Sequence, residues 1–110
     1  MTLLWENASP SSVFAAQSIN VNNAENYDHF LIDTKDWVSE EFRNYYMVPK
    51  NKPSRIGYTG VENSSATYYG RELSINNNIF TFGEGKMNGT VSYPEQRVIP
   101  IEIYGMKLST

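Results

Sequence analysis

The stretch that decides the fold runs from Tyr68 to Gly85 and reads YYGRELSINNNIFTFGEG. Apolar and polar residues alternate on both sides of the asparagine triplet at 76–78, which is typical of strands with one buried face. Asparagine tolerates the positive φ that a tight turn between two strands requires. Gly83 and Gly85 then mark the end of the second strand. This stretch predicts a β-hairpin and sets the fold class as antiparallel β.

Each strand of the predicted hairpin has one face for the core. On 66–75 that face carries Tyr69, Arg71, Leu73 and Ile75, and on 79–82 it carries Phe80 and Phe82. Further short strands are predicted at 14–21, 27–33, 45–48, 54–58 and 97–104, with a turn at 22–26, a loop at 61–65 and an edge segment at 90–93. Seven to eight short strands predict an all-β domain spanning 1–110, an antiparallel β-sandwich of jelly-roll-like type.

Two segments allow more than one local structure. Pro100 lies inside the last strand and cannot donate a ladder hydrogen bond, so we expect it at a sheet edge or at a bulge. We expect Ile99, Ile101 and Ile103 to share one face of that strand. In the segment 33–44, Asp36 suits the start of a short helix through Trp37 and Phe42, and a long loop is the alternative.

The composition limits the function classes. The chain has 110 residues, of which 40% are hydrophobic and 14% aromatic, enough to bury a core without a metal or disulfide. A net charge of −3 argues against nucleic-acid binding. The absence of cysteine excludes disulfides and thiolate metal sites. No apolar run reaches 18 residues and the N-terminal residues lack signal-peptide features, so we predict neither membrane insertion nor secretion.

Residues suited to catalysis are sparse. His29 is the only histidine, so we predict a structural role for it rather than a metal site. Acidic residues near Trp37 suggest one weak catalytic hypothesis, a glycosidase-like carboxylate pair drawn from Asp33, Asp36, Glu40 and Glu41. Helix capping and a solvated surface explain these acids more simply. We therefore predict no enzyme activity, no catalytic residue, no metal and no cofactor.

Aromatic residues are the better candidates for a binding surface, because tyrosine combines an apolar ring with a polar tip and is enriched at interfaces. Adjacent tyrosines in a strand point to opposite faces, so about half of them are expected in the core. The exposed ones would contact a neighbouring subunit or stack on sugar rings. The candidates are Tyr45, Tyr46, Tyr58, Tyr68, Tyr69, Tyr93 and Trp37.

Three segments together resemble a known family. They are the opening LWENASPSSVFAAQ at 4–17, the hairpin YGRELSI and IFTFGEG within 69–85, and the ending VIPIEIYGMK at 98–107. This combination is similar to small tail proteins of siphophages and prophages in Gram-positive hosts. The resemblance implies a β-sandwich that builds the virion tail or contacts the host envelope, with no catalytic residues. Trp5, Pro10 and Phe14 match the family's opening, whereas 33–63 departs from its pattern.

The leading hypothesis is therefore a non-enzymatic structural protein of a phage or prophage tail, assembled in the bacterial cytoplasm and located in the virion. Its expected partners are other tail proteins and further copies of itself, with a role in host recognition. The alternative is a carbohydrate-binding module that reads host cell-wall polysaccharide through tyrosine and asparagine. The position of the exposed tyrosines, at a subunit contact or in an open groove, separates the two.

Overall fold

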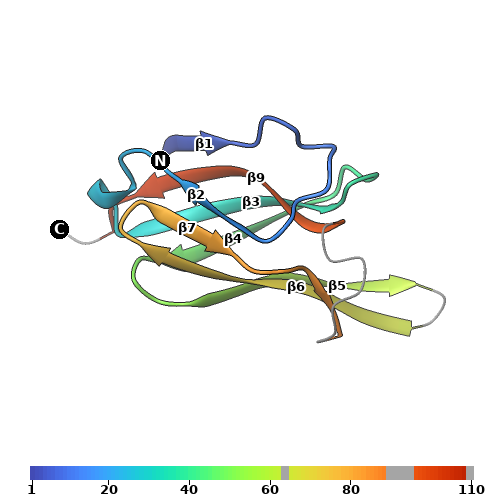
Figure 1. Ribbon diagram of the computed structural model, residues 1–110. Helices are drawn as coiled ribbons and strands as arrows, with labels where there is room; N and C mark the ends of the chain where they lie inside the picture. The colour runs from blue at the N-terminus through green and yellow to red at the C-terminus, as the bar shows by residue number, and fades with distance from the viewer. Residues whose placement is uncertain (63–64, 89–95, 109–110) are drawn as a thin grey trace.

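The computed structural model describes residues 1–62, 65–88 and 96–108, and it is built from two packed antiparallel sheets (Figure 1). This confirms the predicted all-β sandwich. Sheet A has the strand order β1-β9-β3-β4, and sheet B has the order β2-β7-β6-β5, with β8 also paired to β6. In sheet A the strands are β1 (Thr2–Glu6), β9 (Arg97–Met106), β3 (His29–Trp37) and β4 (Arg43–Pro49). In sheet B they are β2 (Gln17–Asn20), β7 (Ile79–Phe82), β6 (Ser65–Asn76), β5 (Ser54–Glu62) and β8 (Lys86–Met87).

The pairing of the strands is nested at one side of the sandwich. The first strand, β1, pairs with the last, β9, while β2 pairs with β7 in the other sheet. This nesting is the jelly-roll-like part of the topology. The remaining strands form hairpins within a single sheet, β3–β4 in sheet A and β5–β6–β7 in sheet B. A short 3-10 helix, η1 (Ala24–Asn26), lies between β2 and β3, where a turn was expected.

The hairpin of β6 and β7 is confirmed as predicted. Asn76 pairs with Ile79, and Asn77 has the positive φ, 54°, that the turn requires. The predicted core face is buried on both strands, at Tyr69, Arg71, Leu73, Ile75, Phe80 and Phe82. Side chains on this face pack against the inner face of sheet A. The ring centroids of Phe80 and Phe30 lie 4.9 Å apart, with the rings edge to face.

The segment between β3 and β4 differs from both alternatives given for 33–44. Residues 33–37 continue β3, 38–42 form a turn, and β4 begins at Arg43, so the predicted helix at Asp36 is wrong. The Asp36 N–H donates to Phe42 O at 3.0 Å and closes the turn. β3 pairs with β4 on one side and β9 on the other. This pairing outweighs the local capping preference of Asp36.

A bulge in β9 corrects the prediction for the last strand. Ile103 pairs with Ile32, Pro100 with Thr34, and Ile99 with Lys35, so Ile101 is the extra residue. Ile99 and Ile103 therefore lie on opposite faces of the sheet. Pro100 does sit beside a bulge, as expected, but β9 is an inner strand of sheet A rather than an edge.

Strand boundaries were missed in three places. No strand was predicted at the positions of β1 and β8. The loop expected at 61–65 is shorter, because β5 extends to Glu62 and β6 starts at Ser65. The predicted edge segment at 90–93 lies outside the described residues.

Candidate functional site

The structure separates the aromatic candidates into two groups. Tyr45 and Tyr68 are 60% and 42% exposed, and they lie on opposite sheets, on β4 and β6. Tyr46, Tyr58 and Tyr69 pack in or against the hydrophobic core. The six candidates within the described residues therefore form no single aromatic platform. Tyr93 lies outside the described residues.

Three of the aromatic candidates converge on one cation. The Arg97 guanidinium lies 4.9 Å from the Trp37 ring and 4.2 Å from the Tyr69 ring, and it donates to Tyr58 Oη at 3.0 Å. Tyr58 in turn donates to Asp36 O at 2.9 Å. Because these residues come from β3, β5, β6 and β9, the cluster joins the two sheets. We assign it a structural role.

The tyrosine hydroxyls in the interior differ in their contacts. Tyr58 Oη has two partners, whereas the buried Tyr46 Oη makes no hydrogen bond. Burial raises the pKa of both Tyr46 and Tyr58 to about 12. These hydroxyls therefore stay neutral through the physiological range.

Two of the acidic candidates, Asp33 and Asp36, lie on opposite faces of one strand. They are three residues apart in β3, so their side chains point to opposite faces of sheet A. Asp33 is 2% exposed and accepts from Arg43 Nη1 at 2.5 Å, and burial raises its pKa despite that cation. Asp36 accepts from the Asn44 amide, and burial together with the charge of Glu40 raises its pKa. Each acid thus has its own structural partner.

The single histidine lies on β3 with a neighbouring acid. Its Nδ1 is 2.9 Å from Asp28 Oδ1, which also accepts from the Leu108 N–H at 2.9 Å. Within the described ranges, no group of three or more His, Cys, Asp or Glu side chains is arranged to hold a metal ion. In the same part of the chain, no helix has the length and apolar character needed to span a membrane.

The outer face of sheet A carries an apolar row that crosses all four strands. The strand register places Leu3 beside Tyr104, Tyr104 beside Leu31, and Leu31 beside Met47. Leu31 points outward because its neighbours Phe30 and Ile32 are fully buried on the inner face. Leu3 and Met47 are 43% and 51% exposed. We call Leu3, Tyr104, Leu31 and Met47 the apolar row.

Charged residues lie in the next row of the same face. Glu6 pairs with Glu102, and Glu102 pairs with Asp33, so three carboxylates from β1, β9 and β3 are adjacent. Tyr104 Oη donates to Glu102 Oε1 at 3.0 Å. Arg43 on β4 supplies the cation at the other side of the sheet. The outer face of sheet A thus combines an apolar row with acids at one side and a cation at the other.

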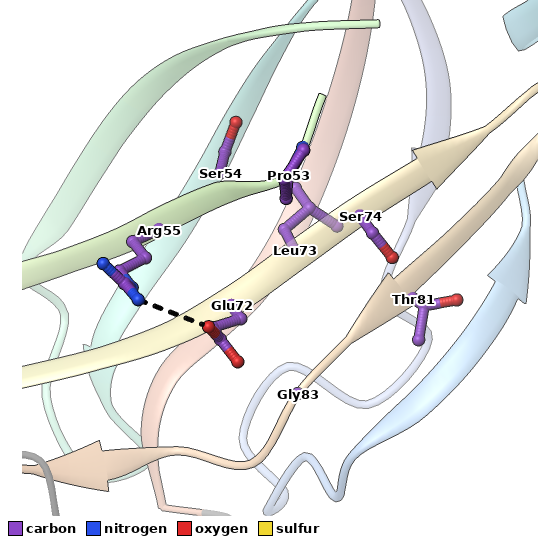
Figure 2. A pocket seen from close by; sticks show the side chains of 8 residues that line it. All are labelled: Pro53, Ser54, Arg55, Glu72, Leu73, Ser74, Thr81 and Gly83. Atoms are coloured by element: carbon purple, nitrogen blue, oxygen red, sulfur yellow. Dashed lines mark ion pairs between the residues drawn. The ribbon is translucent and has the colours of Figure 1, made fainter. Parts of the chain in front are cut away.

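The outer face of sheet B is polar and hollowed. A groove of about 680 Å³ runs across β5, β6 and β7, and Figure 2 shows its lining residues. Arg55 and Glu72 lie side by side there, with an ion pair of 3.7 Å between two exposed side chains. The lining residues are Pro53, Ser54, Arg55, Glu72, Leu73, Ser74, Thr81 and Gly83. A second hollow of about 240 Å³ adjoins it through Arg55 and Glu72 and reaches Tyr68 and Lys86.

Sequence reasoning missed most of both faces. The only local sign of the apolar row is the unbroken run of Phe30, Leu31 and Ile32, since a half-buried strand should alternate. The groove has no local sign, because Arg55 and Glu72 are 17 positions apart and meet only through the β5–β6 register. Both surfaces depend on strand order, which the sequence pattern does not specify.

Comparison with known proteins identifies no relative: no family model, curated protein or solved structure matches the chain.

Proposed function

We propose that this chain is a non-catalytic structural domain of a phage or prophage tail, which assembles through the outer face of sheet A. The observation that carries the proposal is the apolar row, because four strands contribute one apolar side chain each to an outer face. Contiguous apolar surface with a polar rim is typical of a protein–protein contact. The protein would be located in the virion after assembly in the bacterial cytoplasm.

The segments that resemble tail proteins support this proposal through their structural roles. Trp5 from the opening pairs with Ile103 from the ending. The ring centroid of Phe14, also in the opening, lies 5.5 Å from that of Phe82 in the hairpin. Asn7 donates from its side chain to Pro100 O at 2.9 Å, beside the β9 bulge. The opening, the hairpin and the ending thus contact one another and form the framework of the fold. A sequence that retains them would retain the same sandwich.

The layout of the apolar row allows a second copy of the chain as partner, because one side chain comes from each of the four strands. Under a two-fold axis parallel to the strands, the apolar rows of two copies lie on each other and β4 of one copy faces β1 of the other. Such an isologous contact satisfies both copies equally.

Light scattering across a concentration series tests the assembly surface. We expect the wild-type molar mass to rise above the 12.6 kDa of one chain, and Met47→Lys to remain a monomer. Ile79→Lys is the matched control, because Ile79 is 40% exposed on the opposite sheet and should not affect assembly. A wild-type chain that stays monomeric at millimolar concentration, or equal assembly of Met47→Lys, would contradict the proposal.

The virion itself supplies the second test. Phage particles induced from the strain that encodes this chain can be purified and their proteins quantified by mass spectrometry. We expect the chain in the particles at a fixed ratio to the other tail proteins. Its presence in the lysate but absence from purified particles would overturn the tail assignment.

A further inference from the structure

Beside the groove, two glycines flatten the outer face of sheet B. Gly57 of β5 pairs with Gly70 of β6, so neither strand raises a side chain at this point of the outer face. The Tyr68 side chain occupies the space instead: a Cβ atom added to either glycine would lie 2.6 Å from Tyr68 Oη. The tyrosine ring therefore lies along the sheet rather than standing away from it.

This position directs the ring toward the polar part of the groove. Tyr68 pairs with Thr59, and the next outward pairs along the two strands are Gly57–Gly70 and then Arg55–Glu72. The ring reaches over the glycine pair toward Arg55 and Glu72. At 42% exposure it still presents surface to solvent.

Polar groups continue the same face beyond the ion pair. Ser74 pairs with Thr81, and Thr81 pairs with Ser18, so three hydroxyl side chains form a row across β6, β7 and β2. Ser18 Oγ and Thr81 Oγ1 are 2.8 Å apart. Arg55 and Glu72 are 80% and 65% exposed, which leaves their donors and acceptors accessible to a ligand.

We propose that the outer face of sheet B is a saccharide-binding site, in which the Tyr68 ring stacks on one sugar and Arg55, Glu72 and Ser74 bind the hydroxyls of the next. A sugar ring has an apolar C–H face and a polar rim, and it matches an aromatic surface next to donors and acceptors. The groove volume of about 680 Å³ is within the range of small-molecule sites. The site lies on the sheet opposite the apolar row and does not depend on the assembly proposal.

Titration calorimetry with three tetrasaccharides tests the site: β-1,4-linked glucose, β-1,4-linked N-acetylglucosamine and α-1,4-linked galacturonate. We expect saturable binding of at least one probe at millimolar concentration or below. Tyr68→Ala should weaken that binding about tenfold, the effect of one lost aromatic contact, while Tyr68→Phe should retain it. Met47→Lys, on the other sheet, should bind as the wild type does.

A second variant, which blocks the groove, keeps the proposal testable if Tyr68→Ala fails to fold. Ser74 is exposed on the outer face, so Ser74→Arg should fold normally, which the melting temperature checks, and fill the groove. We expect it to abolish binding. Failure of all three probes to bind the wild type, or unchanged binding by both Ser74→Arg and Tyr68→Ala, would overturn the proposal.

Discussion

Tyr46 and Tyr58 differ in what their hydroxyl groups contact, and the difference predicts opposite effects of the same substitution. Tyr46 Oη is buried without a hydrogen-bond partner, so Tyr46→Phe removes an unsatisfied polar atom. We expect it to leave the free energy of unfolding unchanged or to raise it by about 1 kcal/mol. Tyr58→Phe removes the bonds to Asp36 O and from Arg97, and should lower it by about 1–2 kcal/mol.

Urea unfolding of the two variants and the wild type measures this contrast. Near-UV circular dichroism should confirm that the core packing is kept in both. A larger loss for Tyr46→Phe than for Tyr58→Phe would contradict the assignment of their hydroxyl partners.

Asn7 donates two hydrogen bonds to the β9 bulge. Its N–H donates to Ile101 O at 2.8 Å, and its side-chain amide donates to Pro100 O at 2.9 Å. Asn7→Ala keeps the first bond and loses the second, and it also loses the bond that the Ser9 N–H donates to Asn7 Oδ1 at 2.7 Å, so we expect a loss of about 1–2 kcal/mol in the free energy of unfolding. Asn26→Ala, at an exposed position in η1, is the control and should change stability by less than about 0.5 kcal/mol. Equal losses in chemical denaturation would argue against a specific role for the Asn7 amide.

At the scale of the element, the β5–β6 hairpin depends on the fit between Tyr68 and its glycines. In Gly70→Ala the new Cβ would lie within 2.8 Å of three atoms of the Tyr68 side chain, so the ring must move. We expect a loss of about 1–3 kcal/mol, as for other overpacked sites. Adding Tyr68→Ala removes the clash, so the double variant should lose less than the sum of the two single variants. Additive losses in the double-mutant cycle would show that the ring does not cover Gly70.

The elements also show how far the sequence predicts this fold. The β6–β7 hairpin was predicted with its turn and its buried face, because alternation and turn residues act locally. The predicted helix at Asp36 was wrong, because β3 continues past this residue by pairing with β4 and β9. A local sequence pattern does not show which strands will pair with this segment. The bulge at Ile101 places Ile99 on the opposite face of the sheet from Ile103, whereas the local alternation predicted one shared face. The expectation that some candidate tyrosines are buried did not say which ones, and the exposure of Tyr45 and Tyr68 on opposite sheets follows only from strand order.

For the whole molecule, the two outer faces have different chemistry. Sheet A carries the apolar row, and sheet B carries hydroxyls, an exposed ion pair and Tyr68. Between the faces, the aromatic cores of both sheets meet at the Phe30–Phe80 contact and at the Arg97 cluster. A rigid interior of this kind would hold the two faces in a fixed relation, which suits a domain that attaches through one sheet and presents the other.

That interior also predicts how the stability of the whole domain depends on pH. The pKa of Tyr46 and that of Tyr58 are raised to about 12 by burial, against 10 in the unfolded chain. A raised pKa means that the folded state holds its protons longer, so the stability from these groups is complete below pH 10 and is lost as the pH rises toward 12. We expect the free energy of unfolding, measured by urea titration, to fall steeply across that interval. The Tyr46→Phe, Tyr58→Phe double variant should flatten the fall, whereas Tyr45→Phe, at an exposed ring, should leave it in place. An equally steep fall in the double variant would show that other groups control the alkaline transition.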